Sequence, residues 1–160
     1  MKKLILMRHA KSGWDDPTLD DHDRPLNQRG RLAATLMGAY LADAGLAPDC
    51  ALVSSAARTQ ETWARMALDR PADVKPDLYL AGPIAIIGAA QGADANAETI
   101  LLLGHQPGME DAANRFCADA AIDGYPTAKI TVIGFDVGAW ADIQFGSGKV
   151  LSEASPKSLV

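Results

Sequence analysis

The sequence has only two cysteines, Cys50 and Cys117, and it has no long hydrophobic run. The cysteines lie among apolar residues at a spacing that matches neither a metal site nor a redox motif, so we expect two buried thiols in a reducing compartment. The apolar stretch after Lys3 stops at Arg8, which makes it too short for a signal peptide or a membrane span. These absences predict a cytoplasmic protein with no membrane contact.

Runs of lysine and arginine are also absent, and the formal net charge is −5. A groove for nucleic acid is therefore not expected. Apolar residues make up 48% of the chain and charged residues 22%, which is typical of a soluble globular protein rather than a disordered one. A length of 160 residues is enough for one domain with a substantial core. We expect that domain to cover residues 1–146, with a C-terminal tail at 147–160 packed on it or trailing from it.

Apolar periodicity predicts strands and helices in alternation. A strand is expected over Lys2–Arg8, followed by an aperiodic, Asp-rich stretch over Lys11–Pro25. A helix is expected over Asn27–Ala44, with Asn27 as its N-cap and Gly45 as its stop. Its buried face is predicted from apolar residues at four-residue steps, namely Leu32, Leu36, Tyr40, Ala33, Met37 and Leu41.

The rest of the chain continues this alternation and ends in β-structure. The expected strands are Cys50–Ser54, 73–76 and Ile100–Leu103, and the expected helices are Ala57–Leu68, Pro83–Gln91 and a helix from Pro107 to Cys117. Lys129–Phe135 and Ala139–Phe145 alternate in the manner of antiparallel strands at one edge of a sheet. The pattern predicts a three-layer α/β/α sandwich with a mostly parallel central sheet, helices on both faces and an antiparallel edge near the C-terminus.

Distinctive polar residues follow the predicted strands at their carboxyl ends. Arg8 and His9 close the first strand, Arg58 lies in the first turn of the helix after Ser54, and His105 follows the clearest buried strand. In a parallel sheet these ends share one rim, where open α/β sheets bind their ligands. Two arginines, two histidines and helix N-termini at one place make a site for an anion, and a guanidinium can hold phosphoryl oxygens in a two-pronged grip.

An imidazole at such a rim can attack phosphorus. His9 would have to be neutral, with its other ring nitrogen held by an acceptor that fixes the tautomer. Neighbouring guanidinium groups would favour the neutral form by lowering the pKa of the ring. Attack would form a phosphohistidine, which water then hydrolyses. Because the transferred group carries spread negative charge, Arg8, Arg58 and His105 suit its electrostatic stabilisation.

Four motifs in order resemble those of the histidine phosphatase superfamily. They are Arg8-His9-Ala10 with Lys11-Ser12, Arg24-Pro25-Leu26 with Gly30, Ser54-Ser55-Ala56-Ala57-Arg58 with Thr59 and Thr62, and Gly104-His105-Gln106-Pro107-Gly108. With the short length of the chain, they look closest to the small branch that dephosphorylates phosphohistidine on histidine-containing phosphotransfer proteins. The resemblance implies that His9 is the phosphorylated nucleophile. It implies substrate-binding roles for Arg8, Ser12, Arg24, Arg58 and His105, with a turn hydrogen bond as the alternative for Ser12 and an Asp partner as the alternative for Arg24.

The proton donor is the point at which the sequence departs from the larger members of this superfamily. By the resemblance, those members carry a carboxylate donor after the second helix, whereas the corresponding stretch here, Asp77–Gly82, has no glutamate. An imidazole that leaves protonated needs less help than an alkoxide, so this absence favours a phosphoramidate substrate. Among the five acids of the Asp-rich stretch, Asp23 is the candidate to enter the site as a donor or as an arginine partner.

Three interpretations of function follow. The first is a metal-independent phosphatase that acts through phosphorylated His9 on phosphohistidine of a phosphotransfer protein. The second is a phosphatase of small phosphomonoesters, and the third is a non-catalytic module that recognises phosphate, which has no need of the nucleophile. Zinc held by the two histidines is disfavoured because arginines in the same pocket repel a cation, so neither metal nor cofactor is expected. The sequence does not indicate an oligomeric state.

Overall fold

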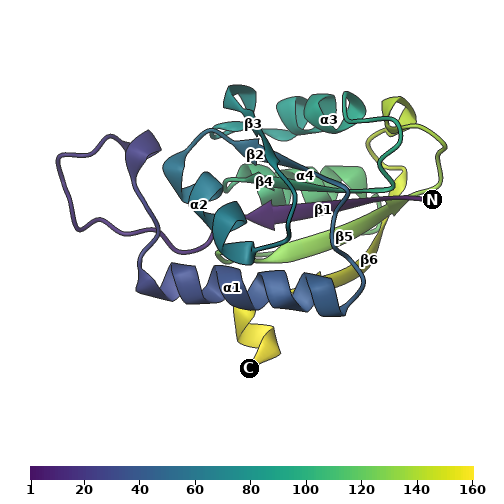
Figure 1. Cartoon of the computed structure of the whole chain (residues 1–160). Coiled ribbons are helices and arrows are strands. Elements are labelled where there is room, and N and C mark those ends of the chain that lie inside the picture. The colour runs from purple at the N-terminus through teal and green to yellow at the C-terminus, as the bar shows by residue number, and fades with distance from the viewer.

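Six strands form a single mixed β-sheet in the computed structural model, which describes residues 1–160 (Figure 1). The strands are β1 (Lys2–Arg8), β2 (Cys50–Ser54), β3 (Ala72–Lys75), β4 (Thr99–Gly104), β5 (Ile130–Phe135) and β6 (Gly148–Ala154). Their order across the sheet is β3-β2-β4-β1-β5-β6. The first four in that order run parallel, while β5 is antiparallel to both of its neighbours. The predicted mostly parallel sheet with an antiparallel edge is confirmed.

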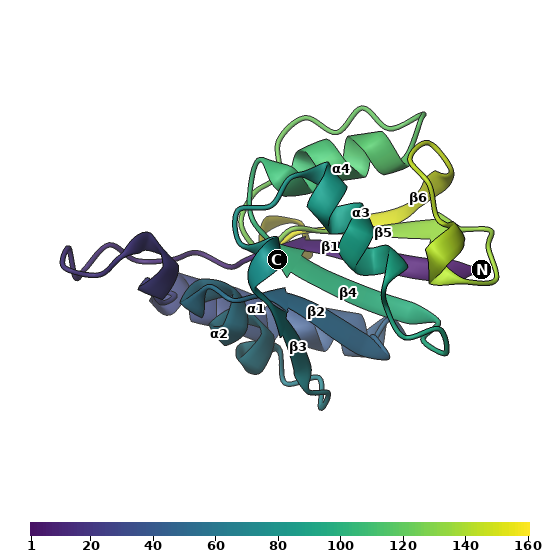
Figure 2. The same cartoon turned by 90° about the horizontal axis from the view of Figure 1, so that it is seen from above.

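Two pairs of helices cover the two faces of this sheet (Figure 2). The helices are α1 (Gln28–Asp43), α2 (Ala57–Met66), α3 (Pro83–Gln91) and α4 (Gly108–Phe116). Along β1, Leu4 and Leu6 join the apolar core beneath α3 and α4, whereas Ile5 and Met7 join the core beneath α1 and α2. Successive side chains of a strand point to opposite faces, so β1 is buried on both sides, as a central parallel strand must be. The result is the predicted three-layer sandwich.

The register of the parallel strands brings the ends of β1, β2 and β4 to one rim of the sheet. Arg8 at the end of β1 lies opposite Gly104 at the end of β4, and Ser54 ends β2 at the same level. The residues just beyond, His9 and His105, therefore leave the sheet side by side. The fold itself thus places the predicted site residues of separate segments at one location.

α1 begins and ends where the sequence predicts. The Asn27 side chain accepts a hydrogen bond from the Gly30 N–H at 2.8 Å, and Gly45 follows the helix with a φ of 71°, in the left-handed region. A Cβ at Gly30 would lie 2.0 Å from the Lys11 carbonyl oxygen, so the first turn of α1 sits directly against the chain that leaves β1. No helix combines the length and the apolar character that crossing a membrane needs.

α1 packs on its neighbours through small residues as well as through the large apolar side chains of Met37 and Leu41. Its buried residues include Ala34, Met37 and Gly38, and a Cβ at Gly38 would lie 2.1 Å from the Met66 carbonyl oxygen of α2. The sequence predicts Leu32 on this buried face, but Leu32 is 63% exposed, so that part of the prediction is wrong. Close approach of two backbones requires small side chains at the contact, which the strength of the hydrophobic pattern does not reveal.

The C-terminal segment also differs from the prediction. Ala139–Phe145 is expected to be a strand, but Trp140–Asp142 forms a 3-10 helix instead. The Trp140 indole is buried and donates to the Ala97 carbonyl oxygen at 2.8 Å. The alternation in this segment reflects two buried anchors, Trp140 and Ile143, rather than a pleated strand. The edge strand is β6, which lies in the segment that the sequence predicts as a tail.

The stretch between β1 and α1 forms a long loop that projects beyond the sheet (Figures 1 and 2). An isolated bridge between Ser12 and Leu26 closes its base, together with the Gly13 N–H, which donates to the Pro25 carbonyl oxygen at 3.1 Å. On the way back, Asp21–Asp23 forms a short 3-10 helix that packs against α2. The aperiodic, Asp-rich stretch is therefore an ordered loop that returns acidic side chains to the rim of the sheet.

Candidate active site

His9 lies immediately after β1 and is buried, with 7% of its surface exposed. Its backbone N–H donates to the Gly104 carbonyl oxygen at 3.1 Å, which continues the pairing of β1 with β4. Its Nδ1 lies 2.6 Å from the Ala10 carbonyl oxygen. A carbonyl oxygen only accepts, so Nδ1 carries the hydrogen and Nε2 keeps its lone pair. His9 therefore has the tautomer that a nucleophilic imidazole requires.

The turn after His9 is held from behind by α2. The Ala10 N–H donates to Thr62 Oγ1 at 3.0 Å, and the Thr62 hydroxyl donates to the Arg58 carbonyl oxygen at 2.7 Å. All three residues are buried. α2 thus fixes the peptide whose carbonyl oxygen orients the His9 ring, and its first turn supplies Arg58 to the same place.

Burial lowers the pKa of His9 to about 4. The hydrogen bond to the Ala10 carbonyl oxygen raises this pKa, and the positive charges of Arg58, Arg8 and Arg24 lower it further. The sequence predicts a lowered pKa from the neighbouring arginines, but the loss of water around the ring is the larger cause. At neutral pH the ring is therefore uncharged.

His105 is buried beside His9, with the two ring centroids 5.4 Å apart. Arg58 Nη2 lies 3.4 Å from His105 Nδ1, which must be the acceptor because a guanidinium only donates. His105 Nε2 then carries the hydrogen and donates to Ser54 Oγ at 2.8 Å. Burial, followed by the neighbouring His9 and the charge of Arg58, lowers the pKa of His105 to about 3. Both rings of the site are thus neutral.

Arg8 completes a group of four residues that we call the cationic pocket: Arg8, His9, Arg58 and His105. Arg8 Nη1 donates to the Tyr125 carbonyl oxygen at 2.9 Å, and its charge lowers the pKa of both histidines. The Nε–H groups of Arg8 and Arg58 are buried without a hydrogen-bond partner. Buried donors are nearly always paired in proteins, so both guanidinium groups retain capacity for an acceptor. The structure brings together all four residues that the sequence places at one rim.

The acid that reaches the cationic pocket is Asp21. Its Oδ2 accepts hydrogen bonds from Arg58 Nη2 at 3.0 Å and from the Tyr79 hydroxyl, while its Oδ1 lies 3.2 Å from Arg24 Nη2. Its main-chain carbonyl oxygen accepts a further hydrogen bond from Arg58 Nη1 at 2.7 Å. The hydrogen bond from Tyr79 is the largest cause that lowers the pKa of Asp21 to about 2. Asp21 is therefore a carboxylate that engages two arginines at once.

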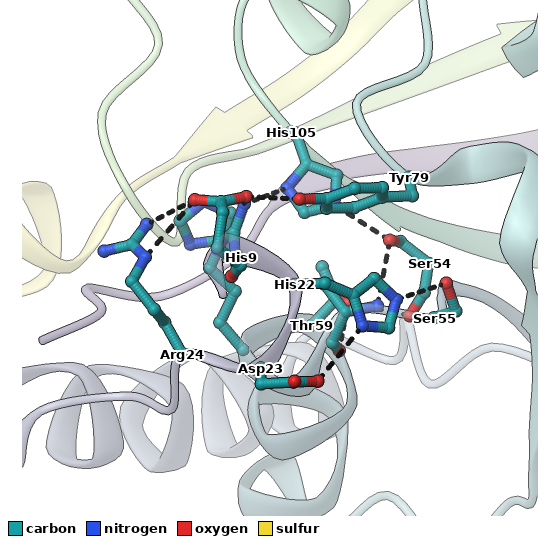
Figure 3. Close-up of polar contacts among 12 residues, drawn as sticks. His9, His22, Asp23, Arg24, Ser54, Ser55, Thr59, Tyr79 and His105 are labelled. Carbon is teal, nitrogen blue, oxygen red and sulfur yellow. Dashed lines mark hydrogen bonds and ion pairs between the residues drawn. The ribbon is translucent and has the colours of Figure 1, made fainter. Parts of the chain in front are cut away.

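Asp23, the acid that the sequence puts forward, contacts His22 instead of the cationic pocket. Its side chain is 62% exposed and lies 3.4 Å from His22 Nδ1. His22 shares a 2.8 Å hydrogen bond with Ser55 and packs edge-on against Tyr79, with ring centroids 4.8 Å apart (Figure 3). One acid of this loop does pair with arginines, as the sequence suggests, but it is Asp21. The choice depends on the 3-10 helix that directs Asp21 toward α2, which no spacing in the sequence reveals.

Tyr79 comes from the stretch in which the sequence has no glutamate. It follows a short 3-10 helix, Pro76–Leu78, and its ring meets His105 edge-on with centroids 5.4 Å apart (Figure 3). A Cβ at Gly108 would lie 1.9 Å from the Ala81 carbonyl oxygen, so the start of α4 fits closely against this stretch. Tyr79 is not predicted from the sequence, because a carboxylate is the only functional group expected in that stretch.

The two remaining candidate substrate-binding residues, Arg24 and Ser12, belong to the long loop. Arg24 is 7% exposed, and its guanidinium lies 3.4 Å from the centre of the Trp14 ring in addition to pairing with Asp21. Ser12 pairs with Leu26 through its backbone at the base of the loop. Arg24 is thus linked to the cationic pocket through Asp21, whereas Ser12 belongs to the closure of the loop.

Groups that could bind a metal or react as thiols contribute little to this site. No cluster of three or more His, Cys, Asp or Glu side chains is arranged to hold a metal ion. Cys50 and Cys117 are free thiols, and burial raises the pKa of both, that of Cys117 to about 11. The charges around the two histidines come mainly from arginines, which suit an anion.

The protein is a layered α/β sandwich. Its arginines and histidines gather at the carboxyl ends of the parallel strands, which is where open α/β sheets bind their ligands. The chain belongs to the histidine phosphatase superfamily (branch 1), whose family model matches residues 4–80. An uncharacterized protein of Mycobacterium tuberculosis is 34% identical to it, over 94% of this chain and 100% of that protein. An uncharacterized chloroplastic protein of Arabidopsis thaliana is 33% identical, over 71% of this chain and 58% of that protein.

Solved structures extend the likeness to the whole fold. A candidate phosphohistidine phosphatase SixA from Nakamurella multipartitia matches with a TM-score of 0.86 at 28% identity, over 97% of this chain and 96% of that chain. A second candidate SixA, from Agrobacterium tumefaciens, matches with a TM-score of 0.78 at 25% identity, over 97% and 99%. The protein histidine phosphatase SixA complexed with tungstate has the same fold, with a TM-score of 0.81 at 22% identity over 99% of both chains. Within its superfamily the chain is SixA-like.

Proposed function

We propose that this protein is a phosphatase that transfers a phosphoryl group from its substrate to His9 and then to water, and that the substrate is phosphohistidine on a phosphotransfer protein. The observation that carries the proposal is the state of the His9 ring. It is a neutral imidazole with a free Nε2 lone pair, beside Arg8, Arg58 and His105. This combination offers a nucleophile together with the positive charge that a transferring phosphoryl group requires.

The reaction begins when His9 Nε2 attacks phosphorus. A P–N bond forms to His9 while the P–N bond to the substrate imidazole breaks, and the electron pair of the broken bond stays on the substrate nitrogen. The leaving imidazole is neutral when its other ring nitrogen already carries a hydrogen. Water then attacks phosphorus, the bond to His9 breaks, and inorganic phosphate leaves. Throughout, Nδ1 of His9 keeps its hydrogen and donates it in the hydrogen bond to the Ala10 carbonyl oxygen, so the ring returns to its starting tautomer.

The cationic pocket stabilises the group in transfer. Phosphoryl oxygens compete with the Asp21 carboxylate for Arg58, and they offer acceptors to the unpaired guanidinium N–H groups. A dianion beside His105 favours protonation of that ring. Nδ1 then gains a hydrogen that it can donate to the phosphoryl group, while the Nε2–H keeps its hydrogen bond to Ser54 Oγ. The tungstate complex of SixA, whose fold this chain shares, supports a tetrahedral oxyanion as the ligand.

The acids near the cationic pocket do not support general acid catalysis of leaving-group departure. The pKa of Asp21, lowered to about 2, keeps that side chain ionised at neutral pH. Asp23 contacts His22 and is largely exposed, so its position does not support the donor role that the sequence suggests. Tyr79 donates its hydroxyl hydrogen to Asp21. A leaving group that departs without an external proton fits this arrangement best, which favours a phosphoramidate over an alkyl phosphate.

We expect phosphohistidine to be hydrolysed in strong preference to alkyl phosphates. General acid catalysis accelerates reactions by about 10²–10⁴-fold in enzymes, and the departure of an alkoxide would lack that acceleration here. The measurement is kcat/KM at one pH for a phosphotransfer protein phosphorylated on histidine, for free phosphohistidine, for phosphoserine and for a sugar phosphate. A preference for the last two would instead make the protein a phosphatase of small phosphomonoesters. Tight binding of phosphate without turnover of any substrate would make it a recognition module.

The His9 ring is expected to titrate near pH 4 in a buffer without tetrahedral anions. Because burial disfavours the charged form, the ring stays neutral as the pH falls through 6.5 and takes up its proton only near pH 4. Ring proton chemical shifts, assigned with a His9→Asn protein, would report the titration by NMR. Added tungstate should raise the midpoint, since an anion beside the ring favours the imidazolium. A midpoint of 6.5 or above without the anion would show that the ring is not held in its nucleophilic form.

A further inference from the structure

A groove of about 730 Å³ opens beside α1, apart from the residues of the cationic pocket. We call it the α1 groove. It is lined by Arg29, Leu32 and Leu36 of α1, by Lys11 and Pro126 of two loops, and by Lys157 of the 3-10 helix η4 (Pro156–Leu159). Figure 1 shows η4, at the C-terminal end of the chain, next to α1. None of these side chains takes part in the chemistry described above.

The α1 groove begins at the chain segment that carries the nucleophile. Lys11 is two residues beyond His9 in the sequence. Pro126 directly follows Tyr125, whose carbonyl oxygen accepts the hydrogen bond from Arg8. A macromolecule that presents a phosphoryl group to His9 can therefore contact this groove with its surface, beyond the residues that hold the phosphoryl group itself.

The charge of the α1 groove is opposite to that of the whole chain. Its lining includes Lys11, Arg29 and Lys157 and no aspartate or glutamate, although the formal net charge of the protein is −5. None of the three cations forms an ion pair within the protein. Val160, which is 97% exposed, also lines the groove. Three unpaired cations on an acidic protein attract an acidic surface and orient it.

The α1 groove is also apolar along its α1 side. Leu32 is 63% exposed, and Leu36 is half-buried. With Arg29 and Ala33, these residues occupy positions 29, 32, 33 and 36, the spacing of one face of a helix. This face is separate from the one that α1 buries against α2 and the sheet, so the fold does not account for the exposed leucine. An apolar strip with a cationic rim matches an amphipathic helix with acids at its flanks.

We propose that the α1 groove docks the protein that carries the phosphohistidine, through a helix whose apolar face is flanked by aspartate and glutamate. The proposal rests on the phosphatase function proposed above and adds the chemistry of the partner surface. Binding in this groove holds the partner next to the cationic pocket, so that the phosphoryl group is delivered to His9 at high local concentration. Affinity for the phosphoprotein then depends on residues that small substrates never touch.

The test is a charge reversal in the α1 groove, Arg29→Glu together with Lys157→Glu. Both side chains are exposed and lie outside the cationic pocket. The probes are a phosphotransfer protein phosphorylated on histidine, with acidic residues beside that histidine, and free phosphohistidine. We expect KM for the phosphoprotein to rise about tenfold, with kcat/KM for free phosphohistidine unchanged. Arg70→Glu with Lys149→Glu changes the charge equally at exposed positions outside the groove and should alter neither value.

The outcomes separate this proposal from the function on which it rests. An equal loss on both substrates, or no loss on the phosphoprotein, overturns the docking proposal and leaves the phosphatase proposal standing. Wild-type protein that hydrolyses neither substrate overturns both. If, without any partner protein, the charge-reversed variant sediments as a smaller species than the wild type, the groove is a contact between copies of this chain, and the docking proposal is overturned. Thermal unfolding checks that the variants fold. If the double variant does not fold, the two single reversals replace it, and each is expected to raise KM for the phosphoprotein by a smaller factor.

Discussion

Replacing His9 with asparagine is expected to abolish turnover of phosphohistidine. Loss of the nucleophile lowers kcat on the order of 10⁴-fold or more in enzymes that form a covalent intermediate. Asparagine retains an N–H that can donate to the Ala10 carbonyl oxygen, the acceptor that holds the imidazole in the wild type, but it has no counterpart of the Nε2 lone pair. The turn after β1 should therefore persist while the chemistry stops. Single-turnover hydrolysis of a phosphorylated phosphotransfer protein measures the effect, and thermal unfolding confirms that the variant is folded.

The covalent intermediate gives the same prediction an independent test. Wild-type protein quenched during turnover of ³²P-labelled substrate should carry a label on His9 that is lost in acid and stable in base. A His22→Asn protein is the matched control, because it removes the loop histidine and leaves the rim of the sheet unchanged, so it should still be labelled. Normal turnover by the His9→Asn protein, or a label on His105, would refute the assignment of the nucleophile.

The fold is predictable from the sequence where burial on both faces leaves a continuous apolar run. β1 and β4 are such strands, and their parallel pairing follows from the helices that alternate with them. The prediction is wrong over Ala139–Phe145 and for the exposed Leu32, and both errors have one cause. An apolar residue in a short pattern indicates that a side chain can be buried. It does not indicate whether a strand, a 3-10 helix or a partner surface will cover it.

The candidate site divides in a similar way. Arg8, His9 and His105 could be predicted because strand ends in a parallel sheet determine where the next residues emerge. Asp21 and Tyr79 could not, because their meeting depends on the path of a long loop and on a 3-10 helix. Five acids in that loop carry the same local signal, and only the folded loop selects one of them to engage the arginines.

The second large effect is expected at Arg58. Arg58→Ala should lower kcat/KM for phosphohistidine by about 10²–10³-fold, the usual cost of removing one preorganised donor to a developing anion. Arg58→Lys should recover only part of this loss, because an ammonium supplies charge without the two-pronged geometry of a guanidinium. Arg65→Ala is the matched control on the same helix. Its side chain is 51% exposed and pairs with Glu61, so its removal should leave kcat/KM unchanged within about twofold.

Arg58 also anchors the long loop through Asp21, and the two roles can be separated. The ion pair joins the buried Arg58 guanidinium, which is 3% exposed, to a carboxylate that is 43% exposed. Asp21→Asn removes that ion pair and leaves Arg58 in place. If Arg58 grips the phosphoryl group, the Asp21→Asn protein keeps most of its activity and binds inorganic phosphate at least as tightly, because the carboxylate no longer competes for the guanidinium. An Asp21→Asn protein as inactive as Arg58→Ala would instead limit Arg58 to holding the loop.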